Sequence, residues 1–384
     1  AASAVVVDHE HARRAMGARL LRETAAFDAP SARPRGMRAD ASCPRYRTMT
    51  VLDVLPLGFP WVTFDPFLFC VHHDDRSPAG NEAMGPSASL AGRNIGSDFE
   101  IKDGWRMYHG DVVPGFPRHP HRGFETVTLA RNGYIDHSDS LGATARFGHG
   151  DAQWMTAGRG VVHSEMFPLV NRDAPNPTEL FQIWLNLAPD DKMVEPHFAM
   201  LWGATIPKVR LGPDGGGAEV AVVAGRLGEA VAPPPPPRSW AARPSSDVAI
   251  WTLRLDAGSQ VTLPPASAGA NRTVYFFLGE EVRVAGTSVR EPRAIRVRPD
   301  VELTIESPRG PTELLLLQGQ PIGAPVAHYG PFVMNTRAEL QQAFADYQRP
   351  GFGGWPWDRD DPVHARERGR FAKHADGRVE DGPG

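Results

Sequence analysis

The sequence contains few cysteines and no long apolar segment. Its 384 residues include two cysteines, Cys43 and Cys70, which form no CxxC pair. Such sparse thiols cannot build a disulfide framework, so the sequence suits a reducing compartment. No apolar run approaches the roughly 20 residues that a transmembrane helix requires. The first residues also lack the basic start and apolar run of a secretory signal. We therefore expect a cytoplasmic protein without a membrane partner.

An excess of basic charge is also lacking. The net charge is −4 and the isoelectric point is about 6.4. No block of lysine and arginine is present, and no helix-turn-helix pattern occurs. Proteins that bind nucleic acids usually present a basic stripe to the phosphates. Direct contact with DNA or RNA is therefore not expected.

Glycine and proline, by contrast, are abundant, with 39 and 37 copies. They separate short segments of alternating apolar and polar residues, which is the pattern of an all-β protein with many tight turns. Two series of strands are predicted, and they indicate two stacked β-barrels or sandwiches. The first series covers residues 61–69, 105–113, 124–129, 143–148 and 180–187, and the second covers 218–225, 247–255, 272–279, 294–298, 302–306 and 312–319.

Helical signals are confined to the two ends of the chain. A helix is predicted within the N-terminal extension, residues 1–48. A second follows Thr336, because Glu339 completes a capping box and Leu340 begins an apolar stripe at helical spacing. The polar residues after this helix are expected to form an extended arm or a frayed end. The five prolines at 233–237 predict a stiff surface loop without a partner.

Two short motifs place metal-ligand residues at matching spacing. "HPHRGFETVT" contains His119 and His121, and "VVHSEMF" contains His163 and Glu165. Residues two apart on a strand share a face, so each pair can point into a barrel. Three imidazoles and one carboxylate suit Fe(II), Mn(II), Ni(II), Cu(II) or Zn(II), rather than Ca(II) or Mg(II). Four such ligands leave two positions of an octahedral metal open.

Other residues near the motifs admit more than one interpretation. Glu125 lies four residues after His121, so on an unbroken strand it would replace Glu165 as a ligand or hydrogen-bond to a ligating histidine. His137 is a candidate neighbour of the site. No histidine or cysteine occurs between His197 and His328, so we expect one metal per chain. The remaining histidines are interpreted as structural or surface residues.

Longer stretches around these motifs resemble a known family. "HPHRGFETVTLARNGYIDHSDSLG", "GDAQWMTAGRGVVHSEMFP" and "LFQIWLNLAPDDKMVEPHF" are similar to the pirin family of the cupin superfamily, and the similarity extends over about residues 50–375. It implies an all-β bicupin: two tandem cupin barrels with a C-terminal helix. The implied units are an N-terminal extension (1–48), a metal-binding cupin domain (49–205), a second cupin domain without metal ligands (206–330), and the helix and tail (331–384).

The resemblance also implies the site and its chemistry. The family's ligands correspond to His119, His121, His163 and Glu165, with Fe(II) as the expected metal, while Glu125 becomes a residue that supports the ligands from outside. The implied activity is quercetin 2,3-dioxygenase, with a flavonol and O₂ as substrates. Glu165 or Glu125 would take the hydroxyl proton. The alternative is a non-enzymatic, redox-sensing regulator that acts through a protein partner. The expected walls of a flat substrate pocket are Phe116, Trp154, Met155, Met166 and Phe167.

Overall fold

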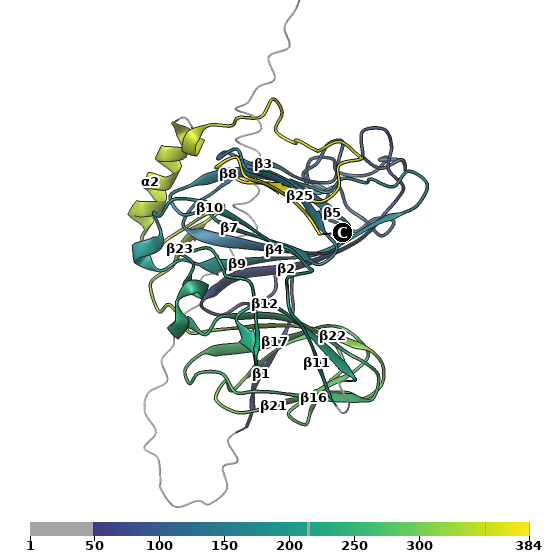
Figure 1. The fold of residues 1–384 in the computed structure, drawn as a ribbon, viewed down its shortest axis with the longest axis vertical. Coiled ribbons are helices and arrows are strands. Elements are labelled where there is room, and N and C mark those ends of the chain that lie inside the picture. The colour runs from purple at the N-terminus through teal and green to yellow at the C-terminus, as the bar shows by residue number, and fades with distance from the viewer. Residues whose placement is uncertain (1–48, 213–215, 350, 384) are drawn as a thin grey trace, which may run out of the picture.

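The computed structural model describes residues 49–212, 216–349 and 351–383. The expected N-terminal extension and its helix lie outside these residues. Four β-sheet layers are stacked along the long axis of the molecule, two in each of two barrels, with one α-helix along the side (Figure 1). This arrangement confirms the prediction of an all-β protein with two tandem barrels and a C-terminal helix. Within the described residues, no helix has the length and apolar character needed to cross a membrane.

The first barrel consists of a five-stranded and a six-stranded sheet. The five-stranded sheet, in spatial order, contains β10 (His197–Leu201), β7 (Asp151–Thr156), β4 (Phe124–Asn132), β9 (Asn176–Asn186) and β2 (Phe67–Ser77). The six-stranded sheet contains β26 (Val379–Asp381), β25 (Phe371–Lys373), β6 (Thr144–Gly148), β5 (Tyr134–Asp139), β8 (Val161–Met166) and β3 (Gly115–His121).

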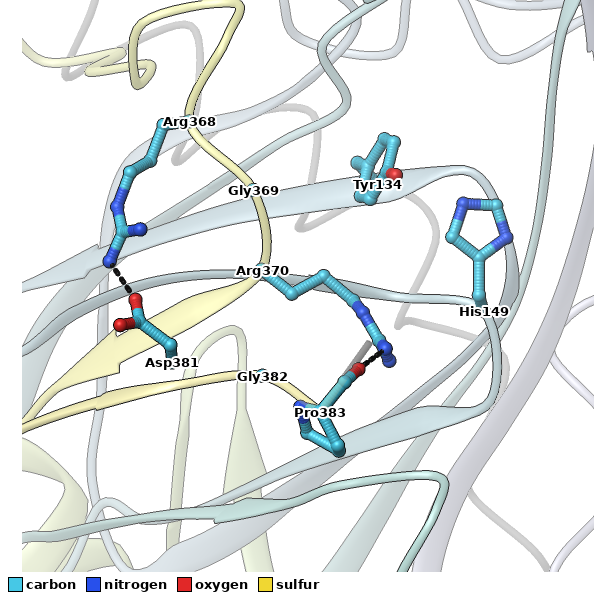
Figure 2. Close-up of a pocket in the computed structure, with 8 residues that line it drawn as sticks. All are labelled: Tyr134, His149, Arg368, Gly369, Arg370, Asp381, Gly382 and Pro383. Carbon is cyan, nitrogen blue, oxygen red and sulfur yellow. Dashed lines mark hydrogen bonds and ion pairs between the residues drawn. The ribbon is translucent and has the colours of Figure 1, made fainter.

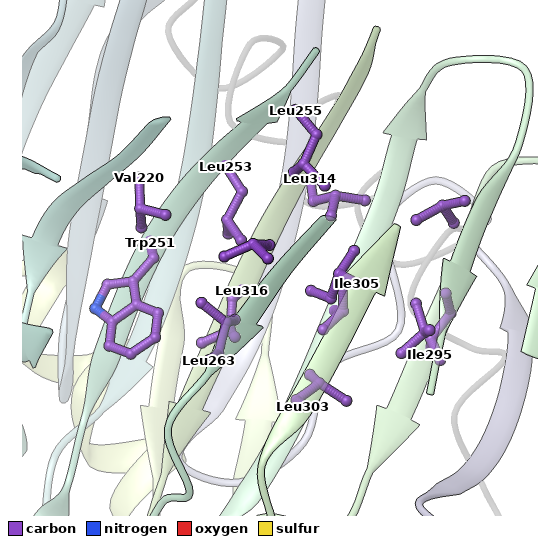
Figure 3. Close-up of a cluster of buried hydrophobic side chains, with 14 of the residues drawn as sticks. Val220, Trp251, Leu253, Leu255, Leu263, Ile295, Leu303, Ile305, Leu314 and Leu316 are labelled. Carbon is purple, nitrogen blue, oxygen red and sulfur yellow. The ribbon is translucent and has the colours of Figure 1, made fainter. Parts of the chain in front are cut away.

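The second barrel pairs a seven-stranded sheet with a four-stranded one. The larger contains β1 (Val51–Pro56), β20 (Arg293–Val297), β17 (Asn271–Leu278), β22 (Thr312–Gly319), β15 (Ala249–Leu255), β12 (Ala218–Ala224) and β11 (Lys208–Leu211). The smaller contains β16 (Ser259–Leu263), β21 (Leu303–Ser307), β18 (Val282–Val284) and β19 (Thr287–Val289). Aliphatic side chains and Trp251 fill the space between them (Figure 3). Strand β1 precedes the first barrel in the chain but pairs with β20 of the second.

The five-stranded sheet of the first barrel packs face to face on the seven-stranded sheet of the second barrel at the centre of the molecule. Trp154 and Ile183 from the first barrel share one buried cluster with Ile250 and Leu315 from the second. Alternate residues of the same strands point the other way, into the barrels. In the seven-stranded sheet, β15 and β22 are apolar on both faces, which is why they appear in the sequence as nearly continuous apolar runs. The inner face of the five-stranded sheet instead carries polar side chains such as Thr128 and Gln182.

The C-terminal segment returns to the first barrel. After the hairpin of β23 (Ala327–Tyr329) and β24 (Phe332–Met334), helix α2 (Arg337–Gln348) begins at the predicted capping box. The Thr336 hydroxyl accepts the Glu339 N–H at 3.2 Å, and the Glu339 carboxylate accepts the Thr336 N–H at 2.8 Å. Short elements complete the chain: the hairpin β13 (Arg226–Leu227) and β14 (Ala230–Val231), and the 3₁₀ helices Pro189–Asp191, Trp240–Ala242, Pro244–Ser246 and Gly351–Gly353.

Three local predictions were wrong. Residues 105–113 form a loop rather than a strand, because Tyr108 adopts a positive φ of 58° and breaks the extended path. The segment 61–69 contributes only its last residues, since β2 begins at Phe67. The tail is neither an arm nor a frayed end: β25 pairs with β6 in the first barrel.

The buried Arg146 holds this tail in place. Its Nε and Nη2 bind the two oxygens of Asp136 at 2.7 and 2.8 Å, while Nη1 donates to the carbonyls of Ala365 and Arg368 at 2.8 Å each. A guanidinium offers five donors in a fixed plane, so one side chain can bind a carboxylate and a returning backbone together. The apolar–polar pattern of the tail does not reveal this contact.

Candidate metal centre

Three histidines converge inside the first barrel. Strands β3 and β8 are antiparallel neighbours, with His119 directly opposite His163. The ring centroids of His119 and His163 lie 4.3 Å apart. The centroid of His121 lies 4.9 Å from each of these two. One ligand nitrogen from each ring lies within 4.8 Å of the others. Among the described residues, this is the one group of three or more histidine, cysteine or acidic side chains arranged to hold a metal ion.

The unpaired ring nitrogens show that these residues suit a metal. Both ring nitrogens of His163 and Nδ1 of His121 are buried without a hydrogen-bond partner among the described residues. Nδ1 of His119 hydrogen-bonds to the Pro117 carbonyl at 2.9 Å, which orients the ring and leaves Nε2 for a ligand. Buried polar atoms normally have partners, so unpaired nitrogens on rings that converge in this way fit the requirements of a bound metal ion.

Burial also keeps these imidazoles neutral, which is the form that binds metal. It lowers the pKa of His119 to about 4 and the pKa of His121 and His163 well below the usual value. The desolvated interior disfavours the imidazolium, and the neighbouring histidines add to this effect. Three neutral imidazoles are therefore suited to bind a divalent transition metal rather than a proton.

Glu165 shares the inner face of β8 with His163 but is not part of the three-histidine group. Its Oε1 accepts the Thr128 hydroxyl at 2.8 Å, and Oε2 accepts the Gln182 amide at 2.8 Å. Burial raises the pKa of Glu165, while these two donors and nearby His137 oppose the rise. Each oxygen of this carboxylate keeps a second lone pair that could bind a metal ion. The role of Glu165 as fourth ligand stays a prediction.

Glu125 does not support the metal ligands, and that expectation was wrong. Its carboxylate accepts hydrogen bonds from Thr156 at 2.7 Å and from Ser239 at 2.5 Å, at the contact between the barrels. The four-residue spacing would place Glu125 on the same face as His121 only if the strand continued unbroken after His121. Instead β3 ends there, Gly123 turns the chain at φ +84°, and β4 starts in the other sheet. Phe124 then faces His121, with rings 5.0 Å apart, and Glu125 faces the opposite way.

His137, the candidate neighbour named from the sequence, lies beside the site. Its ring centroid is 5.5 Å from that of His163, and its Nε2 lies 3.1 Å from Asp139 Oδ2. The ring also stacks on Phe198. It does not belong to the group of converging ligand nitrogens. His137 is therefore a neighbour of the ligands, fixed by Asp139 and Phe198.

The predicted pocket residues are scattered. Phe116 lies 6.4 Å from His119 and contacts Phe167 at 5.9 Å, both between ring centroids. Trp154 instead faces the second barrel, within the central cluster. Met166 is buried on the face of β8 opposite to Glu165 and His163. Met155 packs with Ala157 and Val161 in a small apolar cluster. Of the five, Phe116 is the one with a ring contact to a ligand histidine.

Sequence reasoning missed the aromatic neighbours of His121. The Trp184 ring lies 5.5 Å from that of His121 and packs against Phe69 at 4.6 Å and Phe124 at 4.4 Å. His328, from the C-terminal hairpin, lies 5.9 Å from Trp184. The strand "LFQIWLNL" was predicted, but its inward face was not assigned. Trp184 and Gln182, two residues apart on β9, would have been identified by that assignment.

The second barrel has no equivalent metal site in its described residues. Its strands β16 and β21 correspond to β3 and β8: Val261 stands opposite Ile305 as His119 stands opposite His163, and Leu263 follows. These three aliphatic side chains are buried in the core shown in Figure 3. Aliphatic groups offer no lone pairs, so the position is filled by packing instead of coordination.

A separate hollow lies near the end of the chain, away from the three histidines (Figure 2). Its volume is about 570 Å³, and Tyr134 and His149 line one side. Arg368 pairs with Asp381 at 2.6 Å, and Arg370 pairs with the buried Asp151 at 2.9 Å. Both guanidinium groups are thus neutralised by partners from this chain, and the hollow contains none of the ligand histidines.

Comparison with known proteins gives a consistent result for both barrels. The sequence model of the family described as Pirin matches residues 58–185, and that described as Pirin C-terminal cupin domain matches residues 250–353. A Pseudomonas aeruginosa protein with the provisional name quercetin 2,3-dioxygenase is 39% identical over 239 residues, covering 62% of this chain and 79% of that protein. A pirin-like protein of Solanum lycopersicum is 36% identical over 244 residues, covering 61% and 75%.

A solved structure resembles most of the described fold. The crystal structure of a quercetin 2,3-dioxygenase from Acinetobacter baumannii has a TM-score of 0.63 and 28% sequence identity, covering 79% of this chain and 98% of that one.

Proposed function

Because this chain belongs to the pirin family, we propose that it is a metal-dependent dioxygenase that opens the heterocycle of a flavonol such as quercetin. The proposed centre is one Fe(II) ion in the first barrel, held by His119, His121 and His163. The observation that carries the proposal is the convergence of three imidazoles, of which the buried His121 and His163 have ring nitrogens without partners. The provisional names of relatives and the quercetin 2,3-dioxygenase neighbour support the reaction type. Mn, Ni, Cu or Zn also match these ligands chemically.

The side chains around the ion would have different roles in the reaction. A bound Fe(II) would supply a Lewis acid and a redox centre with positions open to the flavonol and O₂. Glu165 accepts the proton of the flavonol 3-hydroxyl, because it is the buried carboxylate on the face of β8 that carries His163. Thr128 and Gln182 orient that carboxylate by one hydrogen bond each. Once deprotonated, the ring is electron-rich enough to react with O₂, and carbon monoxide leaves as the heterocycle opens.

Two observations favour Glu165 over Glu125 as the base. Glu125 lies between the barrels and accepts hydrogen bonds from Thr156 and Ser239, so it is not available to a substrate at the histidines. Glu165 is the carboxylate on the same strand face as His163. We assign the proton transfer to Glu165 and propose it as the fourth ligand when the ion is bound.

Oxygen uptake after anaerobic loading with Fe(II) tests the proposal. We expect uptake that depends on quercetin, with carbon monoxide released in equal amount. His163→Ala should lose the bound iron and at least 100-fold in rate, whereas His197→Ala should behave as the unchanged protein, because His197 is exposed and outside the group. Glu165→Gln should lower the rate while retaining more iron than His163→Ala.

The regulatory alternative predicts a different outcome of the same experiment. Iron would bind to the three histidines, no quercetin-dependent uptake would occur, and a protein partner would bind in one oxidation state of the iron only. That result would refute the dioxygenase proposal while leaving the metal centre in place.

A further inference from the structure

Arg272 is a buried cation with an unused hydrogen-bonding edge. It lies on β17 of the second barrel and is 2% exposed. Its inward direction follows from strand alternation, since Val274 and Phe276 on the same face belong to the barrel core. Nη1 donates to the Pro264 carbonyl at 2.8 Å. Among the described residues, Nε and Nη2 have no partner.

Two further buried polar atoms, on Gln318 and Ser246, are unpaired among the described residues. We call the positions of Arg272, Gln318 and Ser246 the Arg272 corner. Gln318 stands opposite Arg272 on β22, and its Oε1 is buried without a partner, although its Nε2 donates to the Asp247 carbonyl at 3.2 Å. The hydroxyl of Ser246, next to Asp247, is also buried and unpaired. An unsatisfied buried donor or acceptor is costly, so the unpaired edge of Arg272 and the unpaired Oε1 of Gln318 opposite it indicate a ligand.

The neighbouring acid does not neutralise Arg272. Asp247 makes no hydrogen bond to the guanidinium; its Oδ2 accepts the Ser267 N–H at 2.7 Å. Burial lowers the pKa of Arg272 to about 10, and Asp247 opposes this only in part. A guanidinium remains charged at neutral pH even so. The Arg272 corner therefore holds a positive charge in a desolvated place.

The free edge has the geometry that binds carboxylates elsewhere in this chain. Arg106 uses Nε and Nη2 to bind the two oxygens of Asp75 at 3.0 and 2.9 Å. Arg146 uses the same two nitrogens for Asp136. Such parallel N–H···O bonds are the strong bidentate form of arginine recognition. Arg272 presents this edge with no carboxylate on it.

The Arg272 corner also occupies a defined place relative to the first barrel. Strand pairs β4/β9 and β17/β22 share a bulge at the same position, after Ala130 in one and after Phe276 in the other. Counting back from it, the pair Arg272–Gln318 corresponds to Thr126–Trp184. Trp184 is the aromatic neighbour of His121. The position of Arg272 and Gln318 therefore corresponds to the part of the first barrel beside His121, next to an aliphatic core that has no metal ligands.

We propose that the second barrel binds a small carboxylate on the Nε–Nη2 edge of Arg272, with Ser246 and Gln318 as flanking hydrogen-bonding groups. The near-complete burial of Arg272 limits the ligand to a few heavy atoms, as in formate or acetate. This site is independent of the proposed dioxygenase activity.

Thermal unfolding of the full chain in increasing acetate or formate tests the site, with sodium chloride at equal ionic strength as the reference. Binding to the folded state stabilises it in a saturable manner, and we expect a rise of about 2 °C or more in the midpoint. Arg272→Met should abolish the rise, and Arg272→Lys, which keeps the charge but lacks the fork, should reduce it severalfold. The exposed Arg226 provides the matched control, and Arg226→Met should leave the rise unchanged.

A second result distinguishes binding from general stabilisation. Without carboxylate, Arg272→Met should unfold at the same temperature as the unchanged protein or higher, because it removes an uncompensated buried charge. A crystal grown in acetate should show the carboxylate on Nε and Nη2. The proposal is overturned if acetate gives no saturable rise, if Arg272→Met keeps the rise, or if the crystal shows only water or the Asp247 carboxylate at that edge. Phosphate acting as well as acetate would overturn the preference for a carboxylate.

Discussion

Replacing Glu125 by glutamine should remove a large part of the pH dependence of stability. Burial raises the pKa of Glu125 from 4.5 to about 7, against the opposing hydrogen bonds from Ser239 and Thr156. The folded state therefore holds this proton more tightly than the unfolded chain does. The stabilisation is complete below pH 4.5 and is lost as the pH rises to about 7. The shift corresponds to about 3 kcal/mol in total, of which about 2.5 kcal/mol is lost between pH 5 and pH 8.

Glutamine has the same shape, and the hydroxyls of Ser239 and Thr156 can turn to meet an amide. Glu125→Gln should therefore gain about 2.5 kcal/mol over the unchanged protein on going from pH 5 to pH 8, or about 3 °C in the unfolding midpoint. Denaturant unfolding of both proteins at several pH values measures this difference, and all other titrating groups cancel in the comparison. Glu229→Gln, at an exposed position, is the matched control.

Parallel pH profiles for Glu125→Gln and the unchanged protein would refute the reasoning, because they would show that Glu125 titrates alike in the folded and unfolded states. Metal content gives a second check. Since Glu125 faces the other barrel, Glu125→Gln should retain the full metal content. A loss of metal would show that Glu125 does support the metal ligands.

Three further predictions concern the metal, the tail and the helix. Burial lowers the pKa of His119 to about 4, so the metal-free protein should lose stability as the pH falls from 6.5 towards 4. The loss from this residue should reach about 3 kcal/mol. Denaturant unfolding measures it, and bound Zn(II) should suppress it. Arg146→Met should lower the free energy of unfolding by about 3–5 kcal/mol, since it leaves Asp136 buried without its partner. Hydrogen exchange should then show that the C-terminal tail has detached from the first barrel. Unchanged protection of β25 would contradict the assigned contact. Thr336→Ala should cost about 1 kcal/mol through the lost helix cap, measured by denaturant unfolding against Ser as the conservative replacement.

Local patterns in the sequence carried most of the information about the elements and the ligands. The two-residue spacing of His119 and His121 predicts a shared face in any extended strand, and the structure places both rings beside His163. The capping box at Thr336 is likewise a property of a few consecutive residues. Such features depend on covalent geometry and short-range hydrogen bonds, so they can be inferred before the chain is folded.

Tertiary structure decided which face of each strand meets which neighbour. A turn of one residue, Gly123, sent Glu125 to the contact between the barrels instead of to the metal. The return of the tail to β6 depends on Arg146, more than 200 positions away in the chain. Strand alternation gives two faces but does not say which is inside, and long-range partners leave no periodic trace in the sequence. The ligand spacing is therefore local, whereas the surroundings that tune Glu165 and enclose Arg272 exist only once distant strands have paired.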